Sequence, residues 1–534
     1  MITRREFLKL ITANVLVDGL VSAENSTFFA ENLTQPVKIN EQGRSQKMKV
    51  RLINSDGNHM SEWSLRSLYS SDLHFEPMRR KSEIGSDGIV TIETLNKGVA
   101  LHAYIPVPDF GNVWVTADNC GEGYSADSGT LDFVLESAKS RLNDVTKLTE
   151  TGVFSPECLA HREACKEFLE IAKTKPDKAG FFNLKALSHS LWAGEYAIVE
   201  KSRQSIAKSP KKSFLFGCNA FSYGGDTPYA HYFRKVLNFG TLPFYLASLE
   251  PEEGKPNYDR IDTILEWCER VGIKPKGHPL WWGHQAGIPK WLEGASWQDA
   301  QKHCQRVVAR SVERYKGRIN IWDVINEAHD WANGLKLTHE QEVEITRICC
   351  DTARSKDPNA TIIVNNCCPF GEYSADGSVH LGPVYDRVYT PLAYLDDLMQ
   401  ADVNFDVVGV QIYFPARDML SISKLLDEYA RFGKPVHITE LGVKCAEYQV
   451  QGQESQQLQR TQGEWHFPWS EKIQADWMEW FYTMAYARKE LEAITWWDFR
   501  DPAFIPTSGF LYEDETPKEM YFRLLSLKEN MFHN

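Results

Sequence analysis

The segment IWDVINEAHDW, residues 321–331, ends a run of apolar and aromatic residues with an asparagine and a glutamate, Asn326 and Glu327. The segment PVHITELGV, residues 435–443, has the same pattern and carries Glu440. Short, nearly continuous apolar runs are typical of buried parallel strands, whose carboxyl ends hold the functional residues of α/β folds. Both segments therefore predict strands of such a fold that end in a carboxylate.

Six further segments between residues 214 and 499 have a similar apolar, β-rich character, which makes eight candidate strands. They are residues 214–220, 239–246, 274–282, 320–326, 361–366, 406–414, 435–441 and 493–499. Amphipathic segments of helical period separate most of them, so the chain predicts a closed (β/α)₈ TIM barrel. An open doubly wound sheet fits less well, because no glycine-rich phosphate loop follows the first strand.

The chain has 534 residues, more than one barrel requires. In residues 46–130, short β-rich segments between Gly, Asp and Asn turns predict a small β-sandwich of a carbohydrate-binding kind. In residues 131–210, apolar residues recur at helical spacing, which predicts a helical connector. The barrel is then expected in residues 211–534.

The N-terminus contains TRREFLK at residues 3–9, then an apolar stretch and small residues near position 23. This pattern is typical of a twin-arginine export signal. We expect residues 1–45 to be an export signal and linker, and the protein to be periplasmic or extracellular. Because Asp18 interrupts the apolar stretch, an ordinary basic amphipathic start is the alternative.

The composition limits the partners that the protein can have. The formal net charge is −13, from 59 basic and 72 acidic residues, which argues against nucleic acid. We found no apolar span long enough for a membrane helix, and we expect a monomer. The 16 tryptophans and 21 tyrosines suit sugar ligands, although many belong in a core.

The 11 cysteines do not resemble a disulfide framework, and the adjacent pairs are either core residues or redox-active.

If Glu327 and Glu440 end the fourth and seventh strands, barrel closure brings their carboxylates to opposite sides of one cleft. Two facing carboxylates can hydrolyse glycosides: one protonates the leaving oxygen, and the other attacks the anomeric carbon or activates water. Either glutamate alone fits a surface charge or an ion-pair partner better than a catalytic role, since the chain holds 72 acidic residues. Their shared position at strand ends favours the catalytic interpretation.

The same segments resemble the family 10 glycoside hydrolases, whose best-known members are retaining endo-β-1,4-xylanases. WDVINEA (322–328) is similar to the acid/base segment of that family, and HITELGV (437–443) to its nucleophile segment. KGHPLWWGHQ (276–285) is similar to its third strand, and AITWWDFRD (493–501) to its eighth. The resemblance spans about residues 214–530 and says nothing about the region before it.

The resemblance implies that Glu327 is the general acid/base, Glu440 the nucleophile and Asn326 a donor to the sugar 2-hydroxyl. The remaining substrate-binding candidates are His278, Trp282, Gln411, Tyr413 and Trp497. Gln411 and Tyr413 lie two apart on one strand and so face the same side, where they can donate to the nucleophile. The pKa of the acid should be raised by desolvation and by the second carboxylate. Barrel filling is the alternative role for Trp497.

No cofactor or metal is expected, and the substrate is a polysaccharide or oligosaccharide. A metal site of His278, His284 and His329 is the alternative, although the ligand spacing of such sites is missing.

Several residues depart from the family pattern. Tyr413 replaces a histidine, Gly283 replaces another, and Leu242 and Tyr245 replace an asparagine and a lysine that bind the second sugar on the non-reducing side. These changes predict an altered sugar subsite and weak action on linear xylan. The open alternatives are a hydrolase for a non-xylan or decorated β-glycoside, and a barrel that binds carbohydrate without cleaving it.

Overall fold

The structure is a computed structural model. It describes residues 46–78, 82–94, 98–211, 213–284, 286–329, 332–371, 374, 389–413, 415–447 and 463–531. The predicted export signal and linker, residues 1–45, lie outside the described residues.

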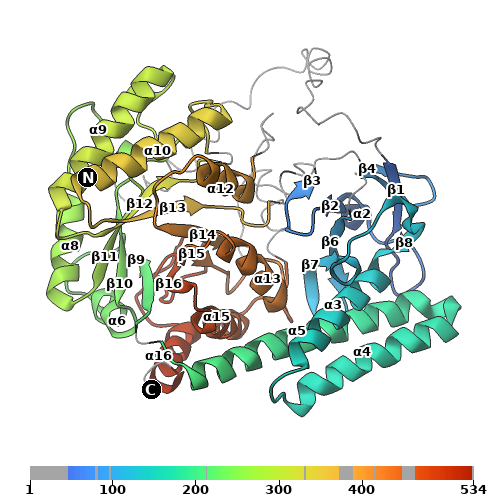
Figure 1. The fold of residues 1–534 in the computed structure, drawn as a ribbon. Helices are drawn as coiled ribbons and strands as arrows, with labels where there is room; N and C mark the ends of the chain where they lie inside the picture. Colours follow the sequence, from blue (N-terminus) through green and yellow to red (C-terminus); the bar gives the residue numbers. More distant parts are fainter. Residues whose placement is uncertain are drawn as a thin grey trace.

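Two four-stranded sheets form the N-terminal part of the molecule (Figure 1). Their orders are β4-β5-β1-β8 and β3-β2-β6-β7. The elements are β1 Gln46–Arg51, α2 Glu62–Arg66, β2 Tyr69–Ser71, β3 Pro77–Met78, β4 Ser82–Ile84, β5 Val90–Thr94, β6 Ala100–Val107, β7 Gly111–Ala117 and β8 Thr130–Asp132. One buried cluster joins Val50 and Ile92 of the first sheet to Leu101 and Val115 of the second. The sheets therefore pack face to face as a small sandwich.

Three helices follow the sheets: α3 Phe133–Thr149, α4 Pro156–Thr174 and α5 Ala179–Lys208. The Asp132 carboxylate accepts the backbone N–H of Leu135, and the Ser155 hydroxyl accepts that of Cys158. These side chains satisfy amide groups at the first turns of α3 and α4. Both helices pack against α5, which runs on toward the barrel (Figure 1).

Eight parallel strands of the described residues close into a barrel in chain order. They are β9 Leu215–Asn219, β10 Phe239–Pro243, β11 Lys274–His278, β12 Ile321–Asn326, β13 Thr361–Asn366, β14 Val407–Tyr413, β15 Val436–Gly442 and β16 Leu491–Trp496. The predicted barrel is confirmed. β11 ends earlier than predicted because Pro279 follows His278 and has no N–H for the ladder.

Helices surround this barrel (Figure 1). They are α6 Pro228–Val236, α7 Leu246–Leu249, α8 Asp259–Val271, α9 Trp297–Tyr315, α10 His339–Lys356, α12 Pro391–Gln400, α13 Met419–Ala430, α15 Glu471–Ala487 and α16 Glu519–Met531. Alternate strand residues divide between two cores. Phe239, Ile321 and Ile363 belong to a cluster that fills the barrel. Their neighbours Trp322 and Ile362 belong to the large cluster that includes residues of the surrounding helices.

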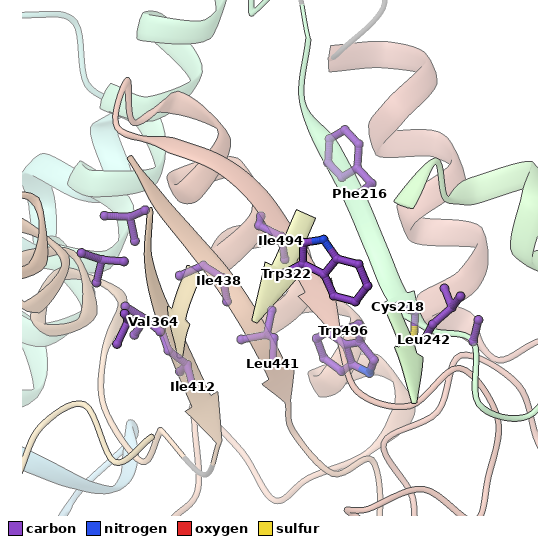
Figure 2. Packing of buried hydrophobic residues seen from close by; sticks show 14 of the residues in the cluster. Phe216, Cys218, Leu242, Trp322, Val364, Ile412, Ile438, Leu441, Ile494 and Trp496 are labelled. Atoms are coloured by element: carbon purple, nitrogen blue, oxygen red, sulfur yellow. The ribbon is translucent and has the colours of Figure 1, made fainter. Parts of the chain in front are cut away.

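Leu242 belongs to the outer of these two clusters, where Figure 2 shows it with Cys218. It is fully buried and pairs in register with Gly277. A Cβ atom added at Gly277 would meet the outward-facing Trp322 ring, so this register position faces the helices. The prediction that Leu242 contributes to an altered sugar subsite is therefore wrong, because strand alternation turns its side chain away from the barrel axis.

Within the described ranges, no helix combines the length and the apolar character that crossing a bilayer requires.

Candidate active site

Glu327 and Glu440 face each other across the amide group of Gln411. The Nε2 atom of Gln411 donates to Glu327 Oε1 at 2.8 Å and to Glu440 Oε1 at 3.0 Å. Each glutamate is only 6% exposed. The structure thus brings together the two carboxyl groups that the sequence placed at the ends of the fourth and seventh strands, here β12 and β15.

The backbone around the two carboxyl groups is irregular. Glu327 has a φ of +54°, a conformation that is uncommon for residues with a side chain, and its N–H donates to the Asn365 carbonyl at 2.9 Å. The register shifts between Asp323 and Ile325 of β12 and again just before Gln411 of β14. Such irregularities re-aim side chains at strand ends. They also explain why strand periodicity alone does not place these side chains.

Three donors converge on Glu440. The Tyr413 hydroxyl donates to Oε2 at 2.8 Å, and the Asn365 amide donates to Oε1 at 2.9 Å beside that of Gln411. Asn365 is fully buried on β13 and was not among the predicted site residues. A polar residue closing the apolar run TIIVNN was the signal that could have identified it.

The Glu327 side of the site holds two of the predicted residues. The Trp282 indole N–H donates to Glu327 Oε2 at 3.0 Å. The Asn326 carbonyl oxygen accepts from Asn365 at 2.6 Å and from Gln411 at 3.3 Å. One amide network therefore orients Asn326 and both carboxyl groups.

His278 is buried beside the Glu440 carboxylate, with Nε2 at 3.7 Å from Oε1. Its Nδ1 atom lies 2.8 Å from Asp323 Oδ2, an oxygen that Lys276 Nζ also approaches at 2.7 Å. Burial lowers the pKa of His278, so the ring is neutral at neutral pH. We assign the ring proton to Nδ1, where it is donated to Asp323, which leaves Nε2 to accept the Tyr245 hydroxyl at 3.2 Å.

Aromatic rings line the rest of the site. Trp497 is 6% exposed, and its ring centroid lies 5.2 Å from that of His278. The Tyr245 ring lies 5.8 Å from that of Trp282, so Tyr245 does reach the site, unlike Leu242. Phe504 is 50% exposed and lies 5.1 Å from the Tyr413 ring.

Burial and the neighbouring Glu327 carboxyl group raise the pKa of Glu440 to about 8. Two carboxyl groups in one buried site cannot both ionise without a large electrostatic cost. The proton belongs to the pair rather than to one residue, and the pair retains it at neutral pH. The geometry thus supplies one proton donor and one carboxylate in the same site.

The three histidines considered as metal ligands do not converge on a common point. His284 stacks on Trp282 at 4.6 Å, whereas His329 lies near Tyr394, with ring centroids 5.7 Å apart. In the part of the chain that the structure describes, no group of three or more His, Cys, Asp and Glu side chains could hold a metal ion.

A closed (β/α)₈ barrel with two facing carboxyl groups at the mouth defines a class of protein, the barrel glycoside hydrolases. Residues 244–525 match the model of Glycosyl hydrolase family 10. The chain belongs to this family.

Curated relatives agree with the family assignment. The chain is 26% identical over 224 residues to Endo-1,4-beta-xylanase B of Neocallimastix patriciarum, covering 40% of this chain and 24% of the relative. It is 25% identical over 318 residues to Endo-1,4-beta-xylanase 1 of Arabidopsis thaliana, covering 57% and 29%. The chain therefore spans less than a third of the length of these two relatives. Endo-1,4-beta-xylanase B of Thermotoga neapolitana is 23% identical over 337 residues, covering 59% of this chain and 88% of the relative.

Among solved structures, xylanase 10B from Thermotoga petrophila RKU-1 in complex with xylobiose is 20% identical, with a TM-score of 0.46. The match covers 62% of this chain and 97% of that chain.

Proposed function

We propose that this protein is a retaining glycoside hydrolase that cleaves β-linked glycans by double displacement. The observation that carries the proposal is the single Gln411 nitrogen in contact with both Glu327 and Glu440. Carboxyl groups bridged by one atom are close together. Retaining enzymes hold theirs about 5 to 5.5 Å apart, whereas inverting enzymes need about 6.5 to 9.5 Å for a water molecule.

Glu440 is the nucleophile and Glu327 the general acid/base. Three donors stabilise the charged form of Glu440, so we place the proton that the pair shares on Glu327. In the first step Glu440 attacks the anomeric carbon while the glycosidic bond breaks and Glu327 protonates the leaving oxygen. In the second step the Glu327 carboxylate takes a proton from water, which attacks the same carbon and releases Glu440.

Other residues of the site orient the sugar. Two donors engage the Asn326 carbonyl oxygen, so its amide nitrogen is the group that donates to the sugar 2-hydroxyl. Trp497 and Trp282 form the surface on which the sugar at the point of cleavage rests, because aromatic faces pack well against sugar rings. Buried His278 packs edge-on against Trp497 and supports that surface.

The proposed activity is xylanase-like, as the names of the relatives suggest. At the non-reducing side, however, the phenol of Tyr245 binds His278 and packs beside Trp282. A bulky ring held there favours short, substituted or non-xylan β-glycosides over long linear xylan. We also propose that the twin-arginine pattern at residues 3–9 directs export, which would bring the enzyme to polysaccharide outside the cytoplasm.

The test of this function is chemical rescue. We expect Glu440→Ala to hydrolyse no aryl β-glycoside, because no covalent intermediate forms. Added azide should restore part of the rate and give a glycosyl azide of inverted configuration, detected by NMR. The matched control, Gln411→Ala, keeps both carboxyl groups and should gain nothing from azide. Near-normal turnover by Glu440→Ala without azide would refute the assignment, and a wild type that binds glycans without cleaving any would support a carbohydrate-binding barrel.

A further inference from the structure

Two loops of the barrel follow the strands that carry the proposed nucleophile and its donors. One begins after Tyr413 at the end of β14 and leads to α13. The other begins after β15, which carries Glu440, and leads to α15. The described ends of these loops, residues 415–419 and 463–466, are held by the N-terminal part of the molecule rather than by the barrel alone.

The edge of strand β7 is the first point of attachment. The carbonyl groups of Phe110 and Asn112 accept the backbone N–H groups of His466 at 2.7 Å and Glu464 at 3.1 Å. Trp114, further along the same strand, donates its N–H to the carbonyl of Ala416 at 2.8 Å. One sandwich strand thus pairs with both loops, as an added strand does at a sheet edge.

Glu195 of helix α5 is the second point of attachment, and it reaches both loops with one carboxylate. Oε1 accepts the N–H of Met419 at 2.8 Å and the indole N–H of Trp465 at 2.7 Å. Oε2 forms a hydrogen bond with the Nε2 atom of the His466 ring. Glu195 is fully buried, so these bonds replace the water that its carboxylate loses on folding.

The surroundings of Glu195 are shaped for this contact. A Cβ atom added at Gly194 would lie 3.1 Å from a Leu420 methyl group, so this glycine lets α5 approach α13 closely. The His466 ring lies between the rings of Trp192 and Trp465, at centroid distances of 3.9 and 3.6 Å. The buried Glu195 side chain therefore lies in a well-packed contact between α5 and the two loops.

We propose that Glu195 is a positioning residue for hydrolysis, and that the sandwich and α5 act as a brace for the two loops. By tying residues 415–419 to residues 463–466, Glu195 keeps the strand ends of β14 and β15 in register. That register places the Tyr413 hydroxyl on the Glu440 carboxylate. The proposal rests on the function proposed above for its kinetic consequence, but the physical link between the two loops can be measured without any substrate.

Hydrogen–deuterium exchange of the full chain tests the physical link. In Glu195→Gln we expect peptides covering 415–422 and 463–470 to exchange about tenfold faster or more, and both together, because one carboxylate holds both. The matched control is Glu200→Gln on the same helix, since Glu200 binds Ser155 within the connector. The control should leave both peptides unchanged. Unchanged exchange in Glu195→Gln, or a change in one loop only, would overturn the bridging role.

Kinetics test the positioning role. The Tyr413 hydroxyl donates a hydrogen bond that stabilises ionised Glu440, so its removal should raise the pKa of that carboxyl group. Tyr413→Phe should therefore move the acidic limb of kcat/KM to higher pH. We expect Glu195→Gln to move that limb in the same direction. The double variant Glu195→Gln/Tyr413→Phe should lose little more activity than the worse single variant. Strictly multiplicative losses, or an acidic limb identical to that of the wild type, would show that Glu195 only supports the fold.

Trp465→Phe provides a milder variant if Glu195→Gln does not fold. It keeps an aromatic ring and removes the indole hydrogen bond to Glu195. We expect faster hydrogen–deuterium exchange at 415–422 as well, because Glu195 joins that segment to the loop that contains Trp465. No change there would refute the link. If the wild type cleaves no β-glycoside, the proposed function fails while the exchange experiment still decides whether the brace exists.

Discussion

The carboxyl groups of Glu327 and Glu440 contact one amide nitrogen and are almost fully buried, an arrangement with a high electrostatic cost. Each loses hydration, and each disfavours ionisation of the other. Asn365, Gln411 and Tyr413 offset part of this cost with hydrogen bonds to the charged form of Glu440. The retained proton is the property that acid catalysis at neutral pH requires.

The pH dependence of activity follows from the raised pKa of Glu440, about 8, which describes the last proton of the pair. Below that pH one carboxyl group of the pair is protonated and can act as the acid. Above it both are ionised and no acid remains, so kcat/KM should fall tenfold per pH unit with a limb near pH 8. Initial rates on an aryl β-glycoside with a poor leaving group measure this limb. A profile that stays flat to pH 9.5 would contradict the shared proton.

Removal of the proposed acid should depend on the leaving group. Glu327→Ala loses the proton donor, so glycosides of poor leaving groups should slow by about 10²- to 10⁴-fold. A dinitrophenyl glycoside needs little protonation and should keep most of its rate of glycosyl-enzyme formation, measured as a burst. Equal losses on both substrates would assign Glu327 a structural role instead.

At the scale of elements, we expect the ends of the barrel strands to determine specificity. β10 ends at Pro243, and the chain then turns so that Tyr245 enters the site while Leu242 stays in the outer core. Any change in the glycone subsite therefore comes from one residue rather than from the predicted pair. Leu242→Asn would place a polar group in an apolar core and should destabilise the protein by about 2 kcal/mol or more.

Tyr245→Lys tests the specificity that this strand end confers. The lysine side chain is narrower than the tyrosine ring, so it should open the non-reducing side of the site. Its ammonium group can donate hydrogen bonds to sugar hydroxyls. We expect kcat/KM to rise more steeply with each added sugar in a xylo-oligosaccharide series than it does for the wild type. Phe221→Leu, a neighbour whose ring lies 5.8 Å from that of Tyr245, serves as the control for a general loosening of the site. A wild type that already degrades long linear xylan efficiently would contradict this account.

At the scale of the whole molecule, buried polar contacts join the N-terminal part to the barrel. The Arg141 guanidinium of α3 lies 2.8 Å from the Asp418 carboxylate at the start of α13 and 2.6 Å from the Ser421 hydroxyl, and both ions of the pair are nearly unexposed. Helix α5 also packs against α13 and α15. The two parts therefore form a joint core rather than a barrel with a detachable module.

Arg141→Ala tests this joint. It leaves the Asp418 charge buried without its guanidinium partner, so we expect a loss of about 3 kcal/mol or more in the free energy of unfolding. Lys173→Ala removes the exposed ion pair with Glu170 on α4 and should cost about 0 to 1 kcal/mol. Denaturant unfolding followed by tryptophan fluorescence measures both. Equal small losses would show that the two parts are energetically independent.

The local sequence pattern was sufficient to predict the barrel and to single out the two glutamates. Apolar runs of strand length, separated by amphipathic helices, predict eight β/α units because burial on both faces demands continuous apolar residues. Glu327 and Glu440 stood out because a carboxylate at the end of such a run is costly unless it is used. The resemblance of the surrounding motifs supplied the proposed roles, with Glu327 as the acid/base and Glu440 as the nucleophile.

Long-range packing decided the rest, since it depends on residues far apart in sequence. The alignment of neighbouring strands is not encoded in any single segment. It decides which way Leu242 points, brings Asn365 into the site and produces the irregular register beside Gln411. Glu195 looks like an ordinary helix residue in the sequence. Only the folded chain shows that its carboxylate meets two loops more than 220 residues away, at Met419 and at Trp465.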